Sequence, residues 1–121
     1  MKKVLLLTGI LLMLSCQSDR SDNVIVLVAY KTQPNKNLQA VAALKKLIDE
    51  VRKEPGFVGI KMHFDSVDNS NILLYEEWED EAYHRNQHMK TEHLKAFIVE
   101  SQSFLEAPPK ISYWKESASF E

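Results

Sequence analysis

Apolar residues along the chain follow two spacings, one typical of strands and the other of helices. Residues 24–30 (VIVLVAY) are a continuous apolar run rich in β-branched residues, which predicts a strand buried on both faces. Segments 57–64 (FVGIKMHF) and 72–78 (ILLYEEW) flank the polar stretch 65–71 and predict a hairpin. A short last strand is expected at residues 111–115 (ISYWK). The pattern therefore predicts four strands.

Two further stretches carry apolar residues at helical spacing. Between residues 38 and 51 one side of the helix is charged and the other apolar, through Leu38, Val41, Leu44, Leu47, Ile48 and Val51. The proline and glycine at residues 55–56 end this helix. The second stretch covers residues 81–105, with Asp80 as its N-cap and Thr91 as the cap of a second segment. Two amphipathic helical regions are thus expected.

The predicted order of elements is β-α-β-β-α-β. This order is typical of an α+β, ferredoxin-like sandwich in which two helices cover one face of an antiparallel four-stranded sheet. Nothing predicted from the sequence covers the other face, yet Ile25 and Leu27 would point to it. A large exposed apolar face is usually an interface. The same face of a second copy would cover it, so we expect a homodimer through the sheet face.

The first residues of the chain have the pattern of a secretory signal peptide. A basic start is followed by the apolar run 4–14, which predicts a signal peptide over residues 1–15. The Met-Leu-Ser-Cys end of this run resembles the lipobox of bacterial lipoproteins, whose cysteine carries lipid. We therefore expect lipidation at Cys16, a lipid anchor in the membrane and a flexible tether over residues 16–23. Gln17 is not the Asp that retains lipoproteins in the inner membrane, so the resemblance implies an outer-membrane location in the cell envelope, facing the periplasm. An ordinary signal peptide with an incidental cysteine is the alternative.

Composition narrows the functional classes. The chain has 121 residues, enough for one domain, which we place at residues 24–116 with a short tail at 117–121. Loss of Lys2 and Lys3 with the signal peptide lowers the 15 basic side chains to 13, against 17 acidic ones, for a net charge of −4. This charge argues against binding to nucleic acid, which needs a basic surface. A single cysteine excludes an intrachain disulfide and a thiolate zinc cluster.

Three short motifs, taken in order, resemble the antibiotic biosynthesis monooxygenase (ABM) domain family. They are Glu-Pro-Gly at residues 54–56, Glu-x-Trp at 76–78 and His-x-x-Thr-x-His at 88–93, and the likeness extends over residues 24–116. The resemblance implies a ferredoxin-like fold that pairs sheet to sheet into a dimeric α/β barrel. It also implies a pocket between sheet and helices. Members of the family include quinol and polyketide monooxygenases that use O₂ without metal or flavin.

The same resemblance places candidate site residues in this pocket. A phenol gives an electron to O₂ more readily as its anion, so the pocket needs a base that works near neutral pH, and histidine is the natural one. We expect His88 and His93 to be catalytic and Glu76, Trp78 and His84 to bind substrate. The alternatives are structural: helix caps or dimer contacts for the histidines, packing for Trp78, and a buried paired carboxylate for Glu76.

Two positions depart from the polyketide enzymes of the family. Leu74 stands where those enzymes carry an asparagine that holds a substrate oxygen, and His84 stands where they carry a tyrosine. These differences argue against a polyketide substrate. His84 and His88 are four residues apart, a spacing that can bind a metal, but Arg85 follows His84 where a His-Glu-x-x-His motif has its Glu. We therefore expect neither metal nor cofactor.

The sequence leaves two functions open. The first is a cofactor-independent monooxygenase that acts on a small aromatic substrate of the quinol or phenol type in the cell envelope. The alternative is a non-catalytic dimer of the same fold that binds a small ligand or serves in a stress response. Oxygen consumption separates the two, since fold alone does not fix chemistry.

Overall fold

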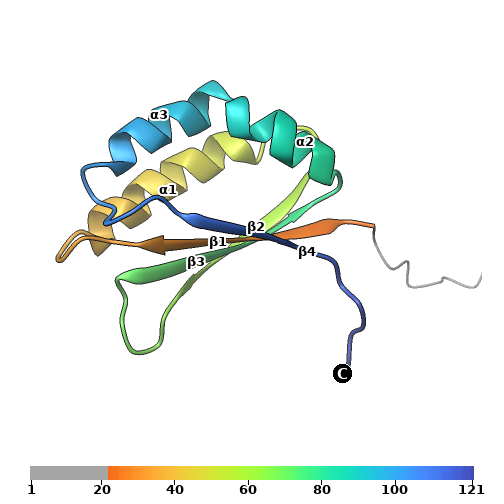
Figure 1. Cartoon of the computed structure of the whole chain (residues 1–121), viewed down its shortest axis with the longest axis horizontal. Coiled ribbons are helices and arrows are strands. Elements are labelled where there is room, and N and C mark those ends of the chain that lie inside the picture. The colour runs from red at the N-terminus through yellow and green to blue at the C-terminus, as the bar shows by residue number, and fades with distance from the viewer. Residues whose placement is uncertain (1–21) are drawn as a thin grey trace, which may run out of the picture.

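The computed structural model describes residues 22–121 (Figure 1). The expected signal peptide, Cys16 and most of the tether lie outside the described residues. The elements follow the order β1 (Val24–Lys31), α1 (Asn37–Val51), β2 (Phe57–Phe64), β3 (Asn71–Trp78), α2 (Glu81–Asn86), a 3₁₀ turn (His88–Lys90), α3 (Glu92–Ser101) and β4 (Lys110–Trp114). None of these helices is long and apolar enough to cross a bilayer.

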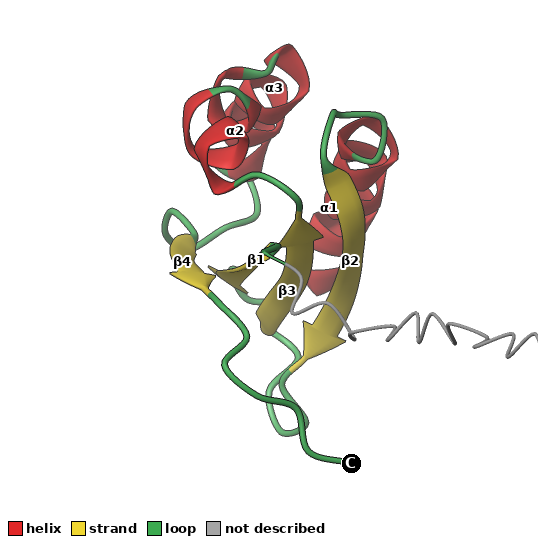
Figure 2. Cartoon of the chain, turned by 90° about the vertical axis from the view of Figure 1, so that its right-hand side faces the viewer, coloured by secondary structure: helices red, strands yellow, loops and turns green. Residues whose placement is uncertain are grey.

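The strands form one antiparallel sheet in the order β2-β3-β1-β4. All helices lie on the same face, with α1 over the β2–β3 side and α2 and α3 over the β1–β4 side (Figure 2). This arrangement confirms the predicted ferredoxin-like α+β fold. Within the described residues the sheet does not close on itself.

The first strand is buried on one face only, so the prediction of two buried faces is wrong for the single chain. Val24, Val26 and Val28 are buried against the helices, whereas Ile25 and Leu27 between them are half-buried. Side chains alternate across a strand, and only one face of this sheet has helices to cover it.

The second helical region is shorter and more broken than the sequence predicted. Asp80 is the N-cap of α2, as expected, because its carboxylate accepts a hydrogen bond from the Tyr83 backbone N–H at 3.2 Å. Thr91 precedes α3 but does not cap it with its side chain, which donates instead to the His88 carbonyl at 2.8 Å. The helix ends at Ser101 rather than near residue 105. The break between α2 and α3 turns two histidines toward the sheet.

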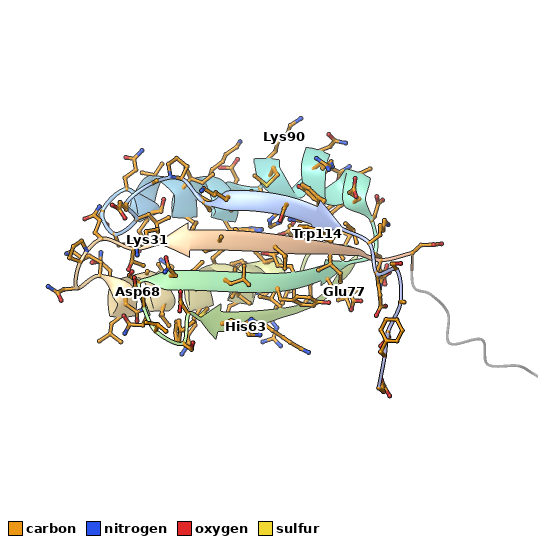
Figure 3. The ribbon with its side chains drawn as sticks, turned by 60° about the horizontal axis from the view of Figure 1, so that its bottom comes forward. Lys31, His63, Asp68, Glu77, Lys90 and Trp114 are labelled. Carbon is orange, nitrogen blue, oxygen red and sulfur yellow. The ribbon has the colours of Figure 1, made fainter. Side chains whose placement is uncertain are left out.

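The two faces of the sheet differ in how they are covered. The covered face carries the core, whose largest fully buried side chains include Trp78, Phe104, Leu44, Ile72 and Leu74. Figure 3 looks onto the open face, where His63, Glu77 and Trp114 are labelled. Leu73, Tyr75 and Trp114 on this face are 37%, 39% and 56% exposed. The open face is therefore apolar and uncovered in the single chain, as the sequence predicted.

Candidate functional site

A cavity of about 580 Å³ lies between the helices and the covered face of the sheet. This volume is in the range of sites that hold small organic ligands. Most of its wall is apolar and includes Val28, Leu47, Ile60, Leu94, Phe97 and Leu105. Its polar lining residues are Tyr30, Glu76, His84, His88, Ser101, Gln102 and Glu106, and the first four are the buried ones that carry a titratable side chain. The cavity is therefore an apolar chamber with a small number of polar contacts.

Three of these polar residues form a buried group that we call the polar end of the cavity: Glu76, His84 and His88. Their exposed fractions are 5%, 1% and 5%. Glu76 comes from the covered face of β3, where it pairs in register with Val26, while His84 lies in α2 and His88 in the 3₁₀ turn. A buried carboxylate needs hydrogen-bond partners. Trp78 supplies one, because its indole N–H donates to Glu76 at 2.9 Å.

His84 is held by one ring nitrogen while the other has no partner. Its Nδ1 lies 2.8 Å from the Tyr113 hydroxyl, and the Arg85 guanidinium covers the Tyr113 ring at 3.7 Å. Nε2 is buried and makes no hydrogen bond within the described residues. It lies 3.6 Å from the nearer Glu76 oxygen, beyond hydrogen-bonding distance. A buried nitrogen without a hydrogen-bond partner lowers the stability of the folded state. This nitrogen belongs to a residue that lines the cavity.

Glu54, in the turn after α1, holds both family-motif histidines. Its carboxylate accepts hydrogen bonds from His88 Nδ1 at 2.9 Å, His93 Nε2 at 2.8 Å and the Tyr83 hydroxyl at 2.9 Å. A proton on His88 Nδ1 leaves Nε2 as the nitrogen that can accept one. Burial lowers the pKa of His88, although the bond to Glu54 opposes this shift. His88 is therefore a neutral imidazole near pH 7, the form that a general base requires.

Tyr30 lines the cavity from the covered face of β1. Burial and the nearby charge of Glu76 raise the pKa of its phenol, so the hydroxyl keeps its proton. Its ring packs edge-on against Phe97, with 6.1 Å between ring centroids. Tyr30 can therefore donate a hydrogen bond to a ligand.

Trp78 and His93 do not line the cavity, and they contact the residues of its polar end or Glu54 from outside it. Trp78 is fully buried, and its ring centroid lies 5.2 Å from that of His84 and 4.9 Å from that of His88. His93 is partly exposed and contacts Glu54. Neither is among the residues that line the 580 Å³ cavity. Trp78 is thus placed to support the two histidine rings, and His93 to hold Glu54.

Tyr30, Glu54 and Tyr113 take part in the site although no sequence motif assigned them a role. Glu54 belongs to the Glu-Pro-Gly motif that carried the family resemblance, and this was the one signal that could have pointed to it. Tyr30 and Tyr113 lie in apolar strand segments without any motif. Tyr113 reaches the site through the pairing of β4 with β1 and its contact with His84 of α2, whereas Tyr30 lines the cavity beside Phe97 of α3.

Two overlapping groups in the described part of the chain bring three possible metal ligands together. One is Glu54, His88 and His93, and the other is the polar end of the cavity. In each group the ligand atoms lie within 4.8 Å of one another. Only the polar end is fully buried and also lines the cavity.

Solved structures share this fold at low sequence identity. A conserved protein from Methanosarcina mazei is 21% identical, with a TM-score of 0.72, over 81% of this chain and 96% of its own. A Pseudomonas aeruginosa protein is 23% identical, with a TM-score of 0.70, over 79% of this chain and 95% of its own. A Nitrosomonas europaea protein, described as a candidate antibiotic biosynthesis monooxygenase, is 16% identical, with a TM-score of 0.71, over 78% of this chain and 90% of its own. These likenesses establish the fold.

A search of curated protein sequences gave no match. The sequence model of the antibiotic biosynthesis monooxygenase family, in contrast, matches residues 23–100. The matched stretch contains β1 to β3, α1, α2 and most of α3, and with them all five of the predicted site residues and Glu54. The chain therefore belongs to the antibiotic biosynthesis monooxygenase family.

Proposed function

We propose that the protein is a monooxygenase that oxidises a small aromatic substrate of the phenol or quinol type with O₂. The observation that carries this proposal is the form of the cavity: an apolar chamber that ends on a buried carboxylate and two imidazoles. An aromatic ring fits the apolar part, and its hydroxyl fits the polar end. Exclusion of water strengthens the polar contacts made there.

The proposed reaction balances without an added reductant. A phenol or quinol with a free ring position beside or opposite a hydroxyl takes up one O₂. One oxygen atom becomes bonded to that ring carbon, and the product is a quinone. The second oxygen atom leaves as water with the phenolic hydrogen and the ring hydrogen. The substrate itself supplies all four electrons that reduce the two oxygen atoms.

The side chains of the cavity take distinct roles in this proposal. His88 accepts the phenolic proton at Nε2, because Glu54 holds its Nδ1–H at 2.9 Å and stabilises the imidazolium that forms. Tyr30 and His84 donate hydrogen bonds to the substrate oxygens, and His84 Nε2 is the buried atom that lacks a partner without ligand. Glu76 stabilises positive charge on either imidazole. Glu54 acts through His88 and is a positioning residue.

The proposed function is tested by oxygen consumption. Purified protein is assayed with a panel of hydroquinones, catechols and naphthols in the presence of a chelator, and uptake is compared with autoxidation. We expect protein-dependent uptake that falls at least about 100-fold in His88→Ala, the usual scale for loss of a general base. His63→Ala is the matched control, since His63 lies exposed on the open face (Figure 3). No uptake by folded wild-type protein with any substrate would contradict the proposal.

A ligand-binding module without turnover is the second candidate, and Leu74 favours it. Leu74 lines the cavity with an apolar side chain where the resemblance implied an oxygen-binding asparagine. Such a module would hold an aromatic ligand without oxidising it. Mass spectrometry of ligand extracted from the purified protein, unchanged after incubation in air, would support this candidate over the enzyme.

We also propose that two copies pair through their open sheet faces and form the dimeric α/β barrel of the family, whose members are commonly dimeric. The support is the row of exposed apolar side chains on this face, which includes Leu73, Tyr75 and Trp114. We further propose that Cys16 carries the lipid anchor and holds the domain at the outer membrane, facing the periplasm. The lipobox-like sequence supports this placement. Incorporation of labelled fatty acid that is lost in Cys16→Ser would test it.

A further inference from the structure

The geometry points to a divalent transition-metal site at the polar end of the cavity, formed by Glu76, His84 and His88. The sequence offered two histidines at helical spacing without the Glu of a His-Glu-x-x-His motif. The fold supplies a carboxylate, because β3 brings Glu76 close to His84 of α2 and His88 of the 3₁₀ turn. Two imidazole nitrogens and one carboxylate oxygen form a ligand set suited to Fe²⁺, Co²⁺ or Zn²⁺.

The spacing of the ligand atoms fits one ion. Two ligands about 2.1 Å from a tetrahedral metal lie about 3.4 Å apart. His84 Nε2 lies 3.6 Å from Glu76 Oε1, close to that separation. The two imidazole rings lie side by side, with centroids 4.5 Å apart, and one ligand atom from each of the three residues falls within 4.8 Å of the others. Small rotations of the side chains would bring all three to one ion.

The hydrogen bonds around the two histidines are those expected of metal ligands. A metal-bound histidine usually donates its other ring N–H to a carboxylate or another oxygen, which fixes the tautomer. His88 does so through Nδ1 to Glu54 at 2.9 Å. His84 Nδ1 lies 2.8 Å from the Tyr113 hydroxyl oxygen, which can accept its N–H when Nε2 binds an ion rather than donating to a substrate. Both residues therefore keep Nε2 for another partner. For His84 that nitrogen is buried and unpaired, which is the independent sign of a missing ligand.

The burial of this group separates it from ordinary clusters of surface histidines and acids. All three residues are at least nine-tenths buried, and they line a cavity that leaves room for further ligands. Three protein ligands with open positions are typical of reactive rather than purely structural metal sites. The second group, Glu54 with His88 and His93, is less buried. Its hydrogen bonds already occupy the atoms that it would offer.

The metal site does not rest on the proposed monooxygenase. It uses His88 Nε2, the atom that accepts the proton in the metal-free reaction, so the two uses of that atom exclude each other. A binding experiment therefore tests the site whether or not the protein consumes O₂.

The experiment is a titration of chelator-stripped protein with Co²⁺, followed by visible absorption, with Zn²⁺ as competitor. We expect one Co²⁺ per chain, with new visible absorption that Zn²⁺ abolishes. His84→Gln and Glu76→Gln should each weaken binding more than tenfold. In Glu76→Gln the new side-chain amide oxygen can still accept from Trp78, so this variant preserves the fold if His84→Gln does not. Tyr113→Phe should weaken binding by about 10- to 100-fold, the usual cost of losing the partner of a ligating histidine.

Two variants serve as controls for this titration. His63→Gln removes an exposed histidine of β2 and should leave Co²⁺ binding unchanged. His93→Gln separates the two groups of ligands, because it belongs only to the one around Glu54. The proposal is overturned if wild-type protein shows no spectral change with Co²⁺. It is equally overturned if His84→Gln binds as wild type does, or if His93→Gln alone abolishes binding.

Discussion

The two tryptophans of this protein lie at the same end of the sheet on opposite faces. Trp78 points to the helices and is fully buried, and Trp114 points to the open face and is 56% exposed. Each indole N–H donates a hydrogen bond within its own strand, Trp78 to Glu76 at 2.9 Å and Trp114 to Ser112 at 2.8 Å. The local arrangement is thus the same, while the surroundings differ. Among the described residues, the covered face is the one that combines buried packing with titratable groups, so the candidate site lies there.

The largest expected difference between the faces is in stability. Trp78→Ala should lower the free energy of unfolding by about 3–5 kcal/mol, because it leaves a large cavity beside Phe57, His84 and His88. In the monomer, at low protein concentration, Trp114→Ala should lower it by less than about 1 kcal/mol. Urea denaturation of both variants measures the difference. Equal losses would mean that the open face is already buried in the protein in solution, as in the proposed dimer, so the measurement is repeated at several protein concentrations.

Two neighbouring carboxylates sharpen the comparison. Glu76→Gln replaces a charged acceptor of the Trp78 N–H by a neutral one, and it should cost about 1 kcal/mol of stability. It should also weaken binding of phenolic ligands to the cavity. Glu77→Gln, one residue further and on the other face, should stay within about 0.5 kcal/mol and leave ligand binding unchanged. Thermal unfolding and ligand titration by fluorescence test both variants. A larger loss in Glu77→Gln than in Glu76→Gln would contradict this assignment of the two faces.

The contribution of the covered face to folding stability should also depend on pH. Burial lowers the pKa of His88, helped by the charge of His84 and opposed by Glu54 and Glu76. A histidine whose pKa is lower in the folded state than its ordinary 6.5 binds fewer protons when folded. Stability is therefore full above about pH 6.5 and declines as the pH falls below it.

Chemical denaturation with a chelator present, between about pH 5 and 8, measures this slope. It should be shallower in His88→Gln. The pKa of exposed Asp68, lowered to about 2 by its bonds to Ser70 and Lys31, places its contribution in a more acidic range. Parallel stability curves for wild type and His88→Gln over this range would contradict the prediction.

The smallest effect on folding is expected on the open face, with a large effect on association. Leu27 is half-buried there in the single chain, so Leu27→Lys should change the stability of one domain by only about 0.5 kcal/mol. A buried lysine without a partner would, however, prevent two sheets from packing together. Analytical ultracentrifugation should find a dimer for wild type and a monomer for Leu27→Lys. A dimer of unchanged affinity in the variant would place the interface elsewhere.

Much of the fold could be predicted because it depends on local patterns. The sequence patterns predicted the ends of several elements to within a residue or two. These patterns are the apolar run at 24–30, the helical spacing from 38 to 51 and the hairpin at 57–78. The end of α3 was placed too late, because residues 102–105 have helical composition. Phe104 among them is fully buried in a turn instead. Tertiary packing therefore ends α3 at this point, although the helical propensity of the next residues would allow it to continue.

The candidate site was predicted less completely. Family motifs supplied Glu76 and His88, and comparison with a family tyrosine position supplied His84. The structure places all three in the cavity wall. Trp78 and His93 were expected in the same wall and lie behind it. Tyr30 and Tyr113 carried no sequence signal, because a tyrosine in a strand is ordinary core composition.

By itself, the sequence determined the elements, their order and the alternation that makes one sheet with two apolar faces. These features follow from hydrophobic periodicity and turn residues, which act over a few neighbouring positions. Only the tertiary structure decided which face became the site and which groups meet there. The site draws each residue from a different element: Glu54 from the turn after α1, Glu76 from β3, His84 from α2 and His88 from the 3₁₀ turn. Their hydrogen bonds join residues up to 34 positions apart, so these contacts exist only once the helices have packed on the sheet.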